Sequence, residues 1–140
     1  MRLAPRRAVG ARRVLAAAAL AVLLGGAAQA QVPGVGKETL QTAPFPGGGR
    51  HSVLVRTTVA PGALVPPHTH PGLELGYVQT GEAEVTLAGA PARRVAAGGS
   101  FAIPPGTVHS VRSTGSGPLV IVSTYVVDAD RPIFAPAKRP

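Results

Sequence analysis

From residue 51 to residue 127 the sequence is divided into short segments by turns that contain Gly or Pro. The turns recur at about 8 to 12 residues, the spacing of strands in sandwiches and barrels. The segments are rich in β-branched residues or alternate between apolar and polar residues, and no stretch after residue 30 keeps an apolar period of 3.6 residues. We therefore predict an all-β sandwich or barrel with strands at 51–59, 73–79, 83–87, 93–96, 100–103, 109–112 and 119–127.

The high content of Gly and Pro fits this interpretation. The 18 Gly and 15 Pro of the 140 residues would suggest disorder if they were spread evenly, but most of those after residue 50 stand between the predicted strands. The chain has no Cys, which excludes disulfides and thiolate metal ligands. A chain of this length supports one domain.

The first 30 residues are typical of an export signal. Five of the 14 basic residues lie within the first 13 positions, before an apolar run of 15 residues at 14–28 and the sequence Ala28-Gln29-Ala30. The run is shorter than the roughly 20 residues of a membrane-spanning helix, so we predict no stable membrane anchor. We predict a signal peptide at 1–30, cleaved near Ala30, and a periplasmic or secreted protein. The pair Arg12-Arg13 leaves both the Sec and the twin-arginine route open.

Removal of this leader changes the charge balance. The full chain has a net charge of +8, but residues 31–140 hold nine basic and six acidic residues, a net charge of +3. These basic residues are scattered, and few aromatic residues could stack on bases. The sequence therefore predicts no nucleic-acid partner.

The mature chain divides into three parts. Residues 31–50 mix Pro, Gly and polar residues, and we predict a flexible lead-in with one short strand near 38–41. Residues 51–127 form the predicted barrel. Residues 128–140 are interrupted by Pro and are predicted to run over the barrel surface.

Histidines at turn-bounded positions indicate a metal site. His68 and His70 lie two residues apart, so on an extended chain they project from the same face. Glu74 follows the Pro71-Gly72 bend, which can return its carboxylate to that side. Imidazoles with one carboxylate suit a divalent transition metal: Fe, Mn, Co, Ni, Zn or Cu. His109 follows another turn, Pro104-Pro105-Gly106.

The spacing of these residues resembles the two sequence motifs of the cupin superfamily. The first motif has intervals of five, one, three and six residues, and it matches Gly62, His68, His70, Glu74 and Gly81. The second has intervals of five, one and two residues, and it matches Gly98, Pro104, Gly106 and His109. The sequence departs from the second motif at Ser113, where the family has an Asn that is not a metal ligand. The resemblance covers about residues 50–127.

This resemblance implies a jelly-roll barrel, the cupin double-stranded β-helix, in which His68, His70, Glu74 and His109 converge on one divalent metal. Because cupins include dioxygenases and isomerases as well as sensors and storage proteins, the resemblance fixes a site and not a reaction. Our leading hypothesis is a metal-dependent enzyme that acts on a small organic molecule inside the barrel. Glu74 would serve as a ligand or, if displaced, as a general base. The alternative is a non-catalytic periplasmic module that binds a small molecule or a metal, because catalytic side chains beyond the ligands are scarce. Exposed strand edges in so small a barrel also favour a homodimer.

Overall fold

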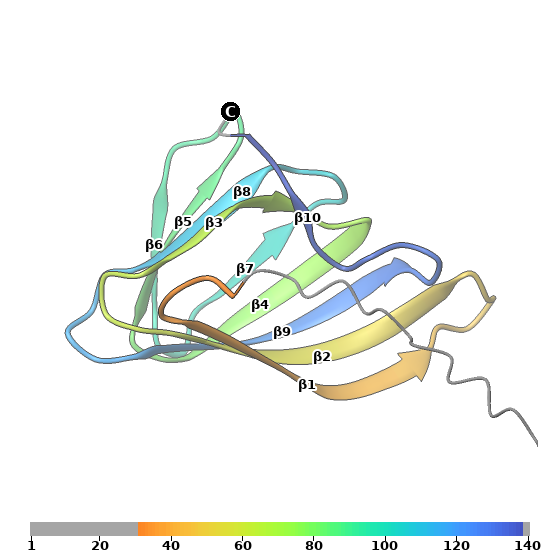
Figure 1. Ribbon diagram of the computed structural model, residues 1–140, viewed down its shortest axis with the longest axis horizontal. Helices are drawn as coiled ribbons and strands as arrows, with labels where there is room; N and C mark the ends of the chain where they lie inside the picture. The colour runs from red at the N-terminus through yellow and green to blue at the C-terminus, as the bar shows by residue number, and fades with distance from the viewer. Residues whose placement is uncertain (1–30, 139–140) are drawn as a thin grey trace, which may run out of the picture.

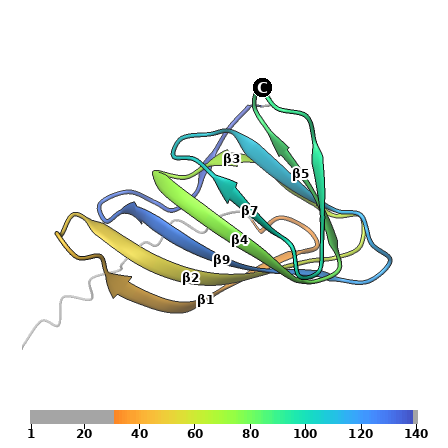
Figure 2. The same ribbon diagram turned by 180° about the vertical axis from the view of Figure 1, so that it is seen from behind.

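The computed structural model describes residues 31–138, and the predicted export signal lies outside the described residues. The described chain forms two five-stranded antiparallel sheets, with strand orders β1-β2-β9-β4-β7 and β10-β3-β8-β5-β6. The sheets lie one above the other in Figure 1, and Figure 2 shows them from behind. Residues 31–138 contain no helix long and apolar enough to cross a membrane. The predicted all-β jelly-roll barrel is confirmed. Its strands are β1 (Val35–Pro44), β2 (Arg50–Val59), β3 (Leu64–Thr69), β4 (Gly72–Thr80), β5 (Glu82–Leu87), β6 (Arg93–Ala96), β7 (Ser100–Ile103), β8 (His109–Ser113), β9 (Leu119–Asp128) and β10 (Ala135–Pro136).

The core forms where the inward faces of the two sheets meet. Strand β9 shows the underlying pattern, since its ten residues alternate without exception between buried and partly exposed positions. The buried apolar residues form two clusters. The larger one includes Val59, Val78, Ile103 and Leu119, and the smaller one consists of Val53, Val55, Tyr125 and Val127.

Strand β3 was not predicted, although it carries the first two histidines of the motif. Its sequence contains Pro66 and Pro67, and proline cannot donate to a strand ladder, so the local signal argues against a strand. The structure accommodates the prolines at an irregularity, because the register of β3 against β8 shifts between Val65 and His68. Cross-strand pairing with β8 therefore prevails over the local propensity.

The lead-in is part of the barrel, contrary to the prediction of a flexible segment with a short strand at 38–41. Strand β1 runs for ten residues and pairs with β2 along its length. Glu38 accepts a hydrogen bond of 2.8 Å from Arg56 on the paired strand. The partner strand supplies the order that the polar local sequence did not indicate.

The C-terminal segment, which was predicted to run over the barrel surface, also pairs with a strand and packs against the core. After β9 the chain leaves the first sheet, and β10 pairs with β3 in the second sheet (Figure 1). The main-chain N–H of Ala137 donates to the carbonyl of Pro67 over 3.0 Å. Ile133 and Phe134 pack against the smaller core cluster. The tail therefore covers part of the barrel interior.

The motif glycines occupy the turns as expected. Gly81 has a φ of 79°, and a Cβ atom there would lie 2.8 Å from the carbonyl oxygen of Pro118. Gly106 has a φ of 71°. At the position of the family Asn, the main chain of Ser113 accepts a hydrogen bond from Gly62 N and donates one to Ala63 O, over 3.1 and 3.0 Å. The main chain thus connects the start of the first motif to the end of β8.

Candidate metal centre

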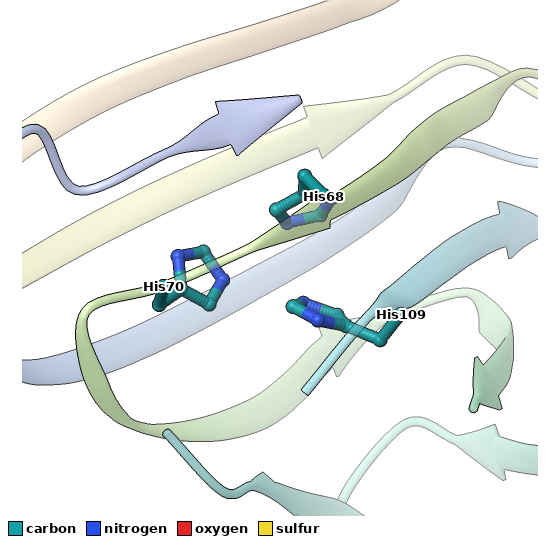
Figure 3. Close-up of side chains that lie close together, drawn as sticks. All are labelled: His68, His70 and His109. Atoms are coloured by element: carbon teal, nitrogen blue, oxygen red, sulfur yellow. The ribbon is translucent and has the colours of Figure 1, made fainter. Parts of the chain in front are cut away.

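Three histidines meet inside the barrel. His68 lies in β3, His70 directly follows that strand, and His109 begins β8, where it pairs with His68. Their rings face one another in Figure 3, with one potential ligand atom from each lying within 4.8 Å of the others. All three residues are buried, at 8%, 2% and 2% exposure. The chelating pair predicted from the sequence thus lies beside the third histidine.

The main chain orients each imidazole. The Nδ1 atoms of His68, His70 and His109 lie 2.7, 2.7 and 3.0 Å from the carbonyl oxygens of Pro66, Ile133 and Thr107, respectively. A carbonyl can only accept a hydrogen bond, so Nδ1 is the donor and carries the proton. In the neutral ring this leaves Nε2 with a lone pair, the form that binds a metal.

Glu74 lies at the same site. Its Oε2 atom is 3.0 Å from His70 Nε2 and 3.3 Å from His109 Nε2. Its other oxygen, Oε1, accepts hydrogen bonds from Ser123 Oγ at 2.8 Å and from Tyr125 Oη at 3.0 Å. Two hydroxyl groups on β9 therefore hold the carboxylate so that Oε2 faces the imidazoles.

The electrostatics favour a neutral imidazole at His68 and a charged carboxylate at Glu74. Burial, followed by the neighbouring His109, lowers the pKa of His68 to about 3. Burial by itself would raise the pKa of Glu74, but its contacts with His109, with His70 and with the Ser123 hydroxyl outweigh burial and hold that pKa well below its usual range. Burial, with the charge of Glu74, raises the pKa of Tyr125, which keeps its hydroxyl protonated as a donor. These are the protonation states that metal binding requires.

The donor set fits a divalent transition metal. His70 Nε2 is buried and, among the described residues, has no hydrogen-bond partner, because both it and the nearby Glu74 Oε2 are acceptors. A cation between such acceptors would satisfy both, whereas unpaired buried polar groups destabilise a fold. A cavity of about 20 Å³, enough for one ion or one water molecule, is lined by His68, Glu74 and His109. The three histidines can therefore hold a metal ion.

Four residues at this site were missed by sequence reasoning: Lys37, Ser123, Tyr125 and Phe134 all line the cavity. A partial signal existed on β9, where Ser123 interrupts an otherwise apolar inward row. Lys37 and Phe134 had no local signal, because they come from the lead-in and the tail. Ser113, at which the sequence departs from the second cupin motif, is buried at the end of β8 and does not line the cavity.

Replacing Tyr125 by Phe is expected to weaken metal binding by about tenfold, since loss of a group that orients a ligand typically has effects of 10- to 100-fold. The ring would keep its packing against His70, while Glu74 Oε1 would lose one of its two donors. Competition titration with a metal chelator measures the change. Tyr77→Phe is the matched control, because Tyr77 is 50% exposed on the outer face. Equal affinities in both variants would contradict the orienting role.

Solved structures with the same fold differ in how similar their sequences are to this chain. A Klebsiella pneumoniae protein with a double-stranded β-helix domain is 23% identical, with a TM-score of 0.64, and the match covers 79% of this chain and 90% of that chain. A recombinant oxalate oxidase in complex with glycolate is 30% identical, with a TM-score of 0.60, and the match covers 74% of this chain and 55% of that chain. The first likeness concerns the fold alone.

The sequence comparisons identify the family. Germin-like protein subfamily 2 member 2 of Arabidopsis thaliana is 38% identical over 77 residues, which cover 51% of this chain and 35% of that protein. The chain therefore spans about a third of the length of this relative. The Cupin domain family matches residues 55–125, which hold both histidine motifs and half of the chain. With the double-stranded β-helix and the three-histidine site in place, the chain belongs to the cupin family.

Proposed function

We propose that this protein is an exported, metal-dependent cupin enzyme that acts on a small organic molecule inside the barrel. One observation carries the proposal: three buried imidazoles, each oriented by a main-chain carbonyl, present ligand atoms within 4.8 Å of one another, and the carboxylate of Glu74 lies beside them. The similarity to an oxalate oxidase that was solved with glycolate supports an enzymatic role. The leader at 1–30 supports a periplasmic or secreted location.

In this proposal His68, His70, His109 and Glu74 are the metal ligands. A bound Fe, Mn, Co, Ni, Zn or Cu ion would supply Lewis acidity toward a substrate oxygen or redox chemistry with dioxygen. Glu74 would accept a proton at Oε2 if substrate displaced it from its ligand position. Ser123 and Tyr125 would keep Oε1 in place during that transfer, because both donate to it. The aliphatic wall, which includes Val65, Val111 and Ile121, excludes bulk water.

The test combines metal analysis with turnover. Protein isolated from its native host is expected to contain about one equivalent of a divalent transition metal per chain, since the site offers one set of ligands. Elemental analysis measures the content, and a panel of small organic acids, alcohols and sugars tests turnover with and without a chelator. Protein that neither contains nor takes up a divalent metal would rule out the proposed function.

A second candidate is a non-catalytic periplasmic module that binds a metal or a small molecule. The small cavity favours it, because 20 Å³ leaves no room for a substrate beside an ion unless the walls move. Apart from the histidines, its lining residues include only Glu74, Lys37 and Tyr125 as titratable groups. Metal-dependent turnover of any compound would exclude this candidate, whereas metal binding without turnover would favour it.

A further inference from the structure

Two side chains from opposite ends of the described chain cover the metal cavity. Lys37 comes from β1 and Phe134 from the segment before β10, and both line the cavity. The Phe134 ring packs against the rings of His68 and His70, with centroids 5.5 and 5.0 Å apart. The Lys37 ammonium lies on this ring, with Nζ 3.1 Å from its centroid.

Among residues 31–138, the charge of Lys37 has no carboxylate partner. On the alternating faces of β1, Glu38 pairs with Arg56 at 2.8 Å, while Lys37 lies opposite Thr57, whose side chain is buried. Within residues 31–138 no carboxylate oxygen lies within 4.0 Å of Lys37 Nζ. Apart from the histidines, Lys37 is the one basic residue that the described part of the chain contributes to the lining of the cavity.

The ammonium is nevertheless charged at neutral pH. The Lys37 side chain as a whole is exposed, but its end lies against Phe134, and this burial lowers the pKa of Lys37 to about 8, with Glu74 acting in the opposite direction. A cation on an aromatic face is held more weakly than one that donates to an oxyanion. Lys37 therefore has a contact that an entering anion can replace.

We propose that Lys37 is the specificity-determining residue of the site, and that its ammonium leaves the Phe134 ring to bind the carboxylate of a small organic anion. This inference rests on the proposed function, because it places the anion beside the histidines. A cationic ligand would be repelled by Lys37, and a neutral one would gain little from replacing the ring. Because the cavity of about 20 Å³ has no room for this anion beside an ion, its entry requires the Lys37 and Phe134 side chains to move, and the aliphatic walls favour a short chain with one or two polar groups.

The test compares acetate with acetamide, which has nearly the same shape but no charge. Calorimetric titrations use the full mature protein as isolated and its Lys37→Met and Lys37→Arg variants. We expect the wild type to prefer acetate, and Lys37→Met to weaken acetate binding by about 10- to 150-fold, the usual effect of losing a charge-assisted hydrogen bond. Acetamide binding should not change, and Lys37→Arg should keep most of the acetate affinity.

Two controls separate Lys37 from other positive charges. Lys138→Met removes the same charge outside the cavity lining, and it should leave acetate binding unchanged. Arg131→Met removes a cation from a second, open cleft of about 630 Å³, which is also lined by His70, Arg50 and Asp128. Loss of acetate binding in Arg131→Met with wild-type binding in Lys37→Met would overturn the inference. So would the absence of any preference for acetate over acetamide in the wild type.

Metal content, measured on the same samples, distinguishes this inference from the proposed function. If metal is present but acetate binding does not depend on Lys37, the inference fails and the function stands. If no metal binds but acetate binding still requires Lys37, the function fails and Lys37 remains an anion-binding residue. A wild-type melting temperature in Lys37→Met confirms that the substitution leaves the fold intact, and retained binding in Lys37→Arg gives the same information independently.

Discussion

Replacing His68 and His70 together by alanine is expected to reduce the metal content of the purified protein from about one equivalent per chain to nearly none. The variant would retain only His109 and Glu74 of the four proposed ligands. Residues that merely orient a ligand contribute about 10- to 100-fold to metal affinity, so the loss of two ligands should exceed 100-fold. Elemental analysis after dialysis against a metal buffer measures the content.

The matched control for this double variant is His51→Ala. His51 is the remaining histidine of the chain, and it lies near the start of β2, away from the lining of the cavity. It should leave the metal content unchanged. Because His70 Nδ1 also donates to the carbonyl of Ile133, circular dichroism should confirm that the double variant still folds. A folded double variant with wild-type metal content would exclude the site.

A Gly72→Ala substitution is expected to destabilise the barrel by about 3 kcal/mol or more, the upper range for overpacking. A Cβ atom at Gly72 would lie 2.0 Å from the carbonyl oxygen of Val126 and 2.7 Å from the Cα of Val127. Both atoms belong to the main chain of β9, which pairs with β4 at this point. Relief of the clash would therefore require separation of two central strands of the sheet.

Thermal unfolding measures this effect, which corresponds to a decrease of roughly 15 °C in the melting temperature. Gly36→Ala is the matched control, because Gly36 also lies in a strand, and a Cβ atom there meets nothing within 4 Å. That variant should be neutral or slightly stabilised. Equal melting temperatures for Gly72→Ala and the wild type would contradict the close approach of the two strands.

Strand prediction succeeded where the local signal and the tertiary environment agree. The predicted strands at 93–96 and 100–103 coincide with β6 and β7, since turns bound both segments and their inward positions are apolar. Prediction failed for β3, whose two prolines argue against a strand, and for most of β1, whose polar residues lie at a sheet edge. In both strands the pairing partner supplies what the local sequence lacks.

The candidate site divides in the same way. His68 and His70 share a face because an extended chain has a period of two residues, and that relation can be inferred from the sequence. The hydroxyl groups of Ser123 and Tyr125 reach Glu74 from 49 and 51 residues away, through the pairing of β4 with β9. The register of β4 against β9, which places Glu74 opposite Tyr125, cannot be inferred from the local sequence of either strand.

Local patterns and spacing in the sequence indicated an all-β chain divided by turns, a histidine pair with chelating geometry, and a resemblance to the cupin motifs that extended this pair to four candidate ligands. These features depend on local backbone geometry and on spacing. In the folded chain, a lysine before the predicted barrel and a phenylalanine after it together cover the cavity, and no local pattern indicated this arrangement. The physical reason is that β1 pairs with β2 and β10 with β3, so both ends of the described chain lie against strands whose side chains line the site.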